Sequence, residues 1–448
     1  MKKTFLLSCL MLAAMPVMAA YTGHVYVDKN KNGVFDQSEK PLAGIKVSDG
    51  LNVVETAADG SFTLPGHERE RFIFITTPSG YKTFNRHYHK IEKKQSGYDF
   101  GLIPYSGRIR KDGSHRYIHI TDTEIFNTEN HADWVNNVRD YARNEQAAFI
   151  IHTGDICYEK GLKAHIKLMN TENMDCPVFY CIGNHDLVKG KYGEELFESI
   201  YGPVYYSFDA GNVHYVVTPM SGGDHAPGYT SDDVCRWLKN DLAHIRPGTP
   251  VVVFNHDLLT YEDTFIFKSK NAGSINLNEY NLKAWVYGHW HINYMKKQGD
   301  VYSVCTSSLD KGGIDHSTTA FRVMHVDSKG DFTSELRYTY LDKNICIASP
   351  AGVMASGVLP VAVNVYSSVS PVREVLYTCL ADGKPVLKNK RLLQSTDWSW
   401  NGELPLSHKY VGKELTLRVT ARFNNGEIAE AESNFICRTE KTVPLFFC

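Results

Sequence analysis

Five short polar segments in this chain each follow an apolar run that has the length of a buried strand. The segments are Asp122-Thr123-Glu124, Gly154-Asp155, Gly183-Asn184-His185-Asp186, His256 and Gly288-His289-Trp290-His291. The runs before them are RYIHIT, AFIIHT, VFYCI, VVVFN and AWVY, all rich in residues that favour strands. Apolar residues from Trp134 to Ala142 repeat at helical spacing between the first two runs. Strands that alternate with helices indicate parallel crossover units.

The polar segments are therefore expected to meet at one edge of a sheet. In parallel sheets the carboxyl ends of the strands open onto a common crevice, where side chains distant in sequence come together. Asp, Asn, His and Glu supply oxygen and nitrogen ligands, and the chain contains no Cys-x-x-Cys pair for a thiolate zinc site. About seven ligands are too many for one tetrahedral ion and suit two ions that share a bridge. The sequence thus predicts a dinuclear metal site.

Other hydrolytic machinery is missing from the sequence. There is no Gly-x-Ser-x-Gly elbow and no Gly-x-x-x-x-Gly-Lys phosphate loop, so the parts of a serine hydrolase or a nucleotide-triphosphate motor are absent. The formal net charge of -2 gives no global attraction for nucleic acid or anionic lipid. Any attraction for phosphate must be local.

The five segments resemble the calcineurin-like metallophosphoesterase superfamily over roughly residues 115 to 335. They match its order Asp-x-[His/Gln/Gly], Gly-Asp, Gly-Asn-His-Asp, His and Gly-His-x-His. The resemblance implies an α/β fold with a four-layer α/β/β/α core. It also implies a dinuclear phosphoric ester hydrolase, in which a hydroxide between two divalent or mixed-valence ions (Mn, Zn or Fe) attacks phosphate mono- or diesters. One ion would be held by Asp122, Asp155 and His291, and the other by Asp155, Asn184, His256 and His289.

The resemblance also gives roles to residues beside these ligands. It implies that His185 stabilises the transferring phosphoryl group or protonates the leaving group, with Asp186 orienting it. Glu124 departs from the usual His, Gln or Gly, and could replace that ligand with a carboxylate. Alternatively Tyr158 could complete the site, because Gly154-Asp155-Ile156-Cys157-Tyr158 matches the Gly-Asp-x-x-Tyr of purple acid phosphatases. Tyr158 could also simply pack as an aromatic side chain on its loop.

Three further histidines lie near the predicted crevice. His119 and His152 fall inside strand-like runs, where hydrogen-bonded core histidines are expected. The loop from Gly222 to His225 and the stretch from Tyr261 to Ser274 are expected to shape the rim, with His225 as a candidate substrate contact.

Residues 1–19 have the features of a signal peptide. Lys2 and Lys3 precede an apolar stretch, and Val17-Met18-Ala19 has the small-residue form of a cleavage site. We therefore expect a periplasmic or secreted protein. Lipidation is less favoured, because the Cys of Leu6-Leu7-Ser8-Cys9 precedes most of the apolar region. No later apolar run reaches the ~18 residues of a membrane span.

A chain of 448 residues is too long for one ordinary domain. We predict an N-terminal β-sandwich over 20–104, a metallophosphoesterase domain over 105–346 and a C-terminal β-sandwich over 347–448. Short alternating runs between Gly- and Pro-containing turns support both sandwiches. Trp398 and Trp400 are expected in the core or at the edge of the third unit, with a ligand-facing position as the alternative. The arrangement resembles calcineurin-like enzymes that carry β-domains at both ends.

The N-terminal unit begins with a loop that has the chemistry of a calcium site. Its oxygen-bearing side chains alternate around a turn glycine, at Asp28, Asn30, Asn32, Asp36 and Glu39. The loop resembles those of B-type repeat domains in bacterial surface proteins, which bind calcium. The alternative is an Asn- and Gly-rich turn that is satisfied by its own backbone.

The cysteines show no disulfide framework. Removal of the leader takes one of the ten cysteines, and the odd remainder has no regular spacing. Cys157, Cys181 and Cys305 lie in or beside apolar runs and are expected to be buried thiols. Cys437 and Cys448 could pair.

Two functions are consistent with these patterns. The first is an exported phosphoesterase that acts on a phosphorylated small molecule, lipid or glycan, with no nucleic acid partner indicated. The alternative is a surface binding protein with an inactive or structural phosphoesterase-like domain. The unusual Glu124 favours the alternative, whereas the intact set of the other ligands favours the enzyme.

Overall fold

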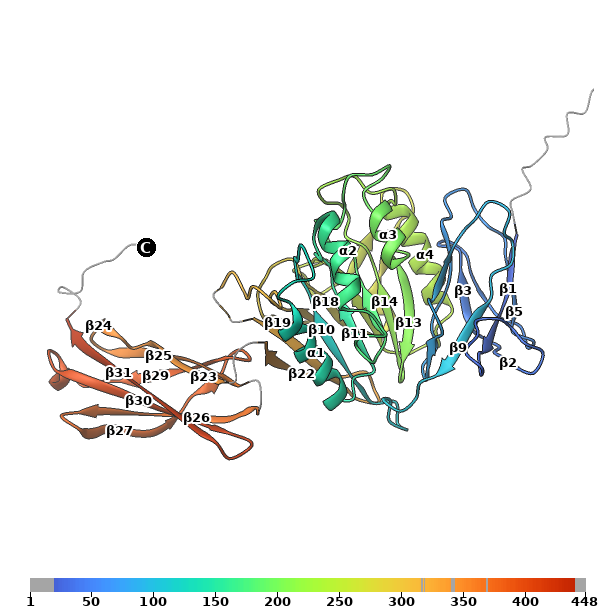
Figure 1. Ribbon diagram of the computed structural model, residues 1–448. Helices are drawn as coiled ribbons and strands as arrows, with labels where there is room; N and C mark the ends of the chain where they lie inside the picture. The colour runs from blue at the N-terminus through green and yellow to red at the C-terminus, as the bar shows by residue number, and fades with distance from the viewer. Residues whose placement is uncertain (1–19, 316, 318, 340–342, 368–369, 440–448) are drawn as a thin grey trace, which may run out of the picture.

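The computed structural model describes residues 20–315, 317, 319–339, 343–367 and 370–439. Three units follow one another along the molecule: an N-terminal β-domain, a mixed α/β core and a C-terminal β-domain (Figure 1). The predicted signal peptide, with Cys9, lies outside the described residues, as does Cys448. Within the described ranges, no helix combines the length and the apolar character needed to cross a membrane.

The N-terminal unit is a small β-sandwich, as predicted. One sheet has the order β2 (Lys40–Pro41), β1 (Tyr21–Val27), β9 (Phe100–Pro104), β7 (Tyr81–Thr83), with β5 (Ser61–Leu64) also paired to β1. The other has the order β4 (Val53–Glu55), β3 (Lys46–Ser48), β6 (Phe72–Ile75), β8 (Tyr88–Lys90). Alternate residues such as Val25, Val47 and Ile73 are buried in one apolar cluster, because successive side chains point to opposite faces of a strand.

The α/β core contains two sheets. The first runs β12 (Val178–Tyr180), β11 (Phe149–His152), β10 (His115–Ile120), β21 (Ala320–Val326), β22 (Phe332–Tyr338). The second runs β13 (Tyr206–Ala210), β14 (Val213–Val217), β15 (Val251–Phe254), β18 (Leu282–Tyr287), β20 (Val301–Cys305), β19 (Tyr294–Gln298). The strands that precede the polar segments pair in parallel, β10 with β11, β11 with β12, and β15 with β18. Parallel pairing is what the sequence predicted.

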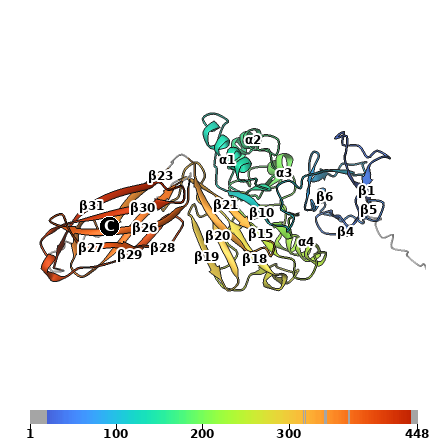
Figure 2. The same cartoon turned by 90° about the horizontal axis from the view of Figure 1, so that it is seen from below.

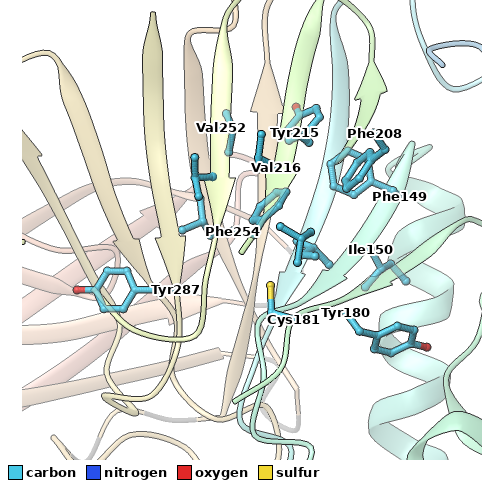
Figure 3. Packing of buried hydrophobic residues seen from close by; sticks show 14 of the residues in the cluster. Phe149, Ile150, Tyr180, Cys181, Phe208, Tyr215, Val216, Val252, Phe254 and Tyr287 are labelled. Carbon is cyan, nitrogen blue, oxygen red and sulfur yellow. The ribbon is translucent and has the colours of Figure 1, made fainter. Parts of the chain in front are cut away.

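Aromatic side chains fill the space between the two sheets (Figure 3). Phe149 from the first sheet meets Tyr215 of the second edge to face, at 4.9 Å between ring centroids. Tyr215 in turn stacks on Phe254 at 5.6 Å. These ring arrangements add to the burial of a large apolar area, and they fix the spacing of the strands that carry the polar segments.

Four helices cover the outer faces of the paired sheets: α1 (Ala132–Asn144), α2 (Tyr158–Leu168), α3 (Glu195–Tyr201) and α4 (Ser231–Ala243). Helices α1 to α3 lie on one side and α4 on the other (Figure 2). Helix α1 buries Trp134 and Val138 at the predicted spacing, and Tyr141 meets Phe321 of β21. The result is the expected four-layer α/β/β/α core. A short hairpin of β16 (Ile266–Lys268) and β17 (Ser274–Asn276), followed by the 3₁₀ turn Leu277–Tyr280, lies in the predicted rim stretch.

The C-terminal unit also has two sheets. Their orders are β23 (Lys343–Ser349), β25 (Val358–Ser367), β29 (Ser399–Pro405), β28 (Leu393–Gln394), and β24 (Gly352–Ala355), β31 (Ile428–Arg438), β30 (Glu414–Phe423), β26 (Val372–Ala381), β27 (Lys384–Arg391). A short 3₁₀ turn, His408–Tyr410, precedes β30. Trp400 is buried in the core, and Trp398 packs at the boundary with the α/β unit, as expected. Because β23 pairs with β25, the division predicted after residue 346 falls inside a strand of this sandwich.

A buried ion-pair cluster joins the N-terminal sandwich to the α/β core. The guanidinium of Arg71 lies 2.8 Å from carboxylate oxygens of both Glu194 and Glu198. Both carboxylates are buried, and burial raises the pKa of Glu198 to about 7 even with Arg71 beside it. Loss of the guanidinium would leave two buried carboxylates without a countercharge.

We expect Arg71→Met to lower the free energy of unfolding by about 3 kcal/mol, because breaking a buried pair leaves an uncompensated charge. Arg69→Met is the matched control, since Arg69 is 52% exposed and pairs with Asp233 near the surface. An exposed pair contributes about 1 kcal/mol or less. Urea denaturation of both variants measures the difference, and equal losses would contradict a special role for Arg71.

Candidate metal centre

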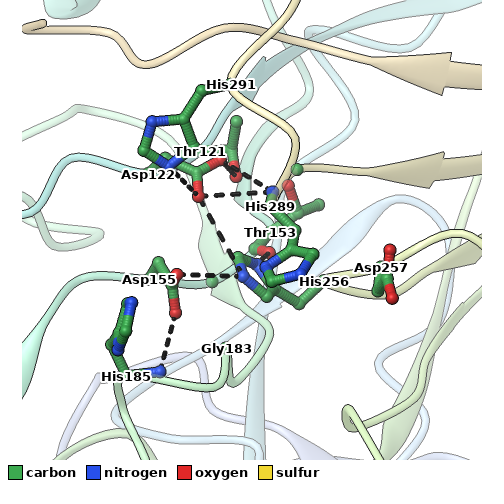
Figure 4. Close-up of polar contacts among 12 residues, drawn as sticks. Thr121, Asp122, Thr153, Asp155, Gly183, His185, His256, Asp257, His289 and His291 are labelled. Atoms are coloured by element: carbon green, nitrogen blue, oxygen red, sulfur yellow. Dashed lines mark hydrogen bonds and ion pairs between the residues drawn. The ribbon is translucent and has the colours of Figure 1, made fainter. Parts of the chain in front are cut away.

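The five polar segments converge where the carboxyl ends of the two core sheets meet (Figure 4). Asp122 follows β10, Asp155 follows β11, and Asn184 follows β12 in the first sheet. His256 follows β15, and the His289-Trp290-His291 segment follows β18 in the second sheet. The parallel order of these strands brings their ends together, and the predicted crevice forms between the sheets.

Asp155 lies at the middle of the cluster. Its Oδ2 is 3.1 Å from Nε2 of His256, and its Oδ1 accepts a hydrogen bond of 3.0 Å from the backbone N–H of His185. Ligand atoms of Asp155, His256 and His289 lie within 4.8 Å of one another. Ligand atoms of Asp155 and Glu124 also lie within 4.8 Å of one another, so this one carboxylate faces candidate ligands in both halves of the cluster.

Asp122 forms the second half of the cluster. Its Oδ1 is 3.2 Å from Nε2 of His291 and 4.0 Å from Nε2 of His256. The backbone N–H of His289 donates to Oδ2 of Asp122 at 3.0 Å. His256 thus lies near both carboxylates, and the cluster is continuous.

The backbone around these side chains is strained. Asp122, Asp155, His289 and His291 have φ values of 51°, 54°, 66° and 49°, in the left-handed region that non-glycine residues rarely adopt. Such strain persists where the surrounding structure enforces it, and it clusters at functional sites. Gly183 is required as well, because a Cβ there would lie 2.2 Å from Oδ1 of Asp155. These loops therefore hold the candidate ligand side chains in position at the cost of backbone strain.

The residues fit two hard or borderline cations. Asp122 and Asp155 are almost completely buried, which is costly for carboxylates without a countercharge. Oδ1 of Asn184 is buried without a hydrogen-bond partner, as expected of an atom that would bind a metal. Burial would lower the pKa of His256, but Asp155 and then Asp122 raise it to about 10. This excess of negative charge is what bound cations would neutralise.

Glu124 faces the same half of the cluster as Asp122. Its Oε1 is 3.5 Å from Nε2 of His291, while its other oxygen pairs with the ammonium of Lys311. The ring of Tyr158 instead packs against Phe126 and His185, which is the packing role considered for it above. The geometry favours Glu124 over Tyr158 as a ligand.

The carboxylate that holds His185 is Asp224, and the orienting role expected of Asp186 is wrong. Oδ2 of Asp224 lies 2.8 Å from Nδ1 of His185. The buried carboxylate of Asp186 accepts hydrogen bonds from the backbone N–H groups of Cys157 and Gly183, at 2.8 and 2.9 Å. Asp186 therefore ties two ligand-bearing loops together and does not contact the imidazole.

Asp224 and Lys311 are the site residues that sequence reasoning missed. The loop from Gly222 to His225 was singled out for His225, whose role as a substrate contact stays a prediction. The backbone N–H of Asp224 donates to the carbonyl of Asn184 at 3.1 Å, so the loop is tied to the ligand segment. No local pattern in the sequence indicates the contact of Asp224 with His185.

The neighbouring core residues agree with the predictions made for them. Both ring nitrogens of His119 are paired, with hydroxyls of Thr153 and Thr306 at 2.8 Å each. His152 is likewise buried and bonded, to the hydroxyl of Thr123 and the N–H of Gly154. The expected buried thiols, Cys157, Cys181 and Cys305, are buried, and every cysteine that the structure describes is free.

The candidate calcium loop gathers its oxygen-bearing side chains on one turn. The carboxylate of Asp28 accepts hydrogen bonds from the N–H groups of Asn32 and Gly33, and the amides of Asn30 and Asn32 donate to Asp36. Glu39 accepts from the N–H groups of Lys29 and Asp36. These contacts agree with the alternative of a turn satisfied by its own groups, and calcium binding stays a prediction.

The comparisons of this chain with known proteins agree on one family. The family model for calcineurin-like phosphoesterase matches residues 115–293, and the model for the N terminal of calcineurin-like phosphoesterase matches residues 29–104. Purple acid phosphatase 13 of Arabidopsis thaliana is 26% identical over 215 residues, which are 45% of this chain. The match spans only 36% of that relative's own length.

Two solved structures with low similarity were also found. A conserved uncharacterized protein of Streptococcus pneumoniae, titled a predicted phosphoesterase, has 13% identity and a TM-score of 0.27, covering 50% of this chain and 90% of its own. Vacuolar Protein Sorting 29 of Cryptosporidium parvum has 10% identity and a TM-score of 0.27, covering 65% and 99%.

Proposed function

Because the chain belongs to the calcineurin-like metallophosphoesterase superfamily, we propose that it is an exported, dinuclear metal-dependent hydrolase of phosphate mono- or diesters. The observation that carries the proposal is the position of Asp155, a buried carboxylate whose oxygens lie within 4.8 Å of ligand atoms of His256 and His289 and also of Glu124. Its natural substrates would be phosphorylated small molecules, lipids or glycans.

The proposed ligands divide into two sets that share Asp155. Asp122, Glu124 and His291 would complete one set, and the other would contain Asn184, His256 and His289. Manganese, zinc or iron suits these oxygen and nitrogen donors. When bound, two such ions neutralise phosphoryl oxygens and lower the pKa of water toward ~7.

The protein's own groups position the ester and move a proton. Because Nδ1 of His185 is held by Asp224, its Nε2 is left to face the phosphoryl group or the leaving oxygen. Burial lowers the pKa of His185, but the Asp224 hydrogen bond and the charges of Asp155 and Asp224 more than offset this and raise it, so the proton-donating form is favoured. Asp186 holds the two loops beside Asp155 in a fixed position relative to each other, because it accepts hydrogen bonds from both.

We expect the metal-loaded protein to hydrolyse p-nitrophenyl phosphate, bis-p-nitrophenyl phosphate or both, and to contain about two metal ions per chain. Activity and metal content are measured on the same preparation, after restoring manganese, zinc or iron. Hydrolysis that persists after complete metal removal would contradict the proposal.

The alternative is a surface binding protein with an inactive phosphoesterase-like domain. The pairing of Lys311 with Glu124 favours it, because an ammonium group competes for a carboxylate that a metal would need. Protein that carries metal but turns over neither ester would support this alternative.

A further inference from the structure

Exposed apolar side chains gather around the candidate metal centre. Of the eleven large hydrophobic residues that the described chain leaves exposed, six lie in segments next to the centre: Phe126, Tyr158, Tyr261, Tyr294, Met295 and Ile314. Exposed apolar side chains that occur singly are ordinary, but a group of them beside a polar crevice indicates a binding surface. The metal chemistry proposed above uses none of these side chains.

One aromatic pair lies beside His289. Tyr261, which is 72% exposed, stacks on Trp290 with ring centroids 5.8 Å apart and an interplanar angle of 27°. The indole N–H of Trp290 donates to Oδ1 of Asp257 at 3.0 Å, which fixes the ring. These side chains, His289 and Ile314 line a pocket of about 500 Å³. A fixed ring at the wall of a pocket is a surface for an apolar or flat group.

A second aromatic pair lies beside His185. Phe126 and Tyr158 are 54% and 43% exposed, and their rings stack at 6.2 Å with an interplanar angle of 15°. The ring of Tyr158 also meets the imidazole of His185 at 5.2 Å. Rings therefore continue from the imidazole outward to the protein surface.

The two pairs flank the centre at different ends. His185 and the His289 segment lie on opposite sides of the Asp155 carboxylate (Figure 4). A phosphate monoester has one substituent and would leave one aromatic pair unused. A phosphodiester has two substituents and could place one on each pair.

We propose that the centre binds phosphodiesters that carry a ring on each substituent, one against Tyr261 and Trp290 and the other against Phe126 and Tyr158. This inference rests on the proposed phosphoesterase function and specifies its substrate class. Aromatic substituents are favoured because each pair has exposed ring surface, and aromatic rings attract one another in offset-stacked or edge-to-face contacts.

The kinetic test compares bis-p-nitrophenyl phosphate with p-nitrophenyl phosphate, which share a leaving group but differ in the second ring. We expect Tyr261→Ala and Phe126→Ala each to lower kcat/KM for the diester about fivefold. The monoester should respond to at most one of the two variants. Leu393→Ala is the control, because Leu393 is equally exposed, at 72%, in the C-terminal sandwich. A diester rate that is unchanged in either aromatic variant would overturn the proposal.

A binding test separates this inference from the proposed activity. Diphenylphosphinate and dimethylphosphinate carry two substituents on phosphorus and have no ester bond to cleave. Calorimetry on the metal-loaded protein should show tighter binding of the diphenyl compound, weakened about fivefold by each aromatic variant. Selective binding of the diphenyl compound without any ester hydrolysis would refute the proposed phosphoesterase activity and support the diester-binding site. Ester hydrolysis with equal binding of both phosphinates would support the proposed phosphoesterase activity and refute the diester-binding site.

Discussion

Asp155→Asn is expected to remove bound metal and hydrolytic activity together. The carboxylate lies near ligand atoms of both proposed sets, so the neutral amide loses both the charge and one of the two oxygen ligands. A bound ion provides several kcal/mol of transition-state stabilisation, and we therefore expect kcat/KM to fall by about 10³-fold or more. Metal analysis and kinetics on one preparation measure both effects.

The control for this variant is Asp300→Asn, which makes the same chemical change at a fully exposed position. Circular dichroism of both variants establishes that the fold is retained. An Asp155→Asn protein that keeps two ions and near-normal turnover would show that Asp155 does not bridge them.

His185→Ala is expected to retain metal and lose mainly rate. His185 donates its backbone N–H to Asp155, whereas its imidazole is held by Asp224. Loss of a positioned proton donor costs about 10²- to 10⁴-fold, so kcat should fall by that factor with little change in metal content. Asp224→Asn should cause a smaller loss of kcat, because the imidazole stays but loses its anionic partner.

These variants also check the role assignment. Equal metal loss in His185→Ala and Asp155→Asn would show that His185 is a ligand and not a group that acts on the ester. An Asp224→Asn protein with unchanged kcat would show that the 2.8 Å contact does not position the imidazole.

The convergence of the candidate ligands could be predicted because strand periodicity and ligand chemistry are both local. Each segment of candidate ligands follows an apolar run. Parallel strands place their carboxyl ends at the same edge of a sheet, whatever conformation the connections between them adopt. The same logic failed for Asp186, whose position next to His185 in sequence suggested a contact. A carboxylate that accepts two backbone N–H groups is turned toward the loops, and sequence proximity does not report that direction.

Contacts made by distant loops could not be predicted in the same way. Asp224 reaches His185 only because its loop hydrogen-bonds to Asn184, and Lys311 reaches Glu124 from a segment after β20. The predicted domain boundary after residue 346 falls inside β23 for a related reason. Strand membership is set by pairing with β25, which depends on the assembled sheet and not on the alternation within one segment.

A crystal structure of the metal-loaded protein, with anomalous scattering measured at the absorption edge of the bound metal, tests the central claim most directly. The account predicts two anomalous peaks that flank Asp155, one beside Asp122 and His291 and the other beside His256 and His289. A single peak, or peaks that do not touch the carboxylate of Asp155, would contradict it.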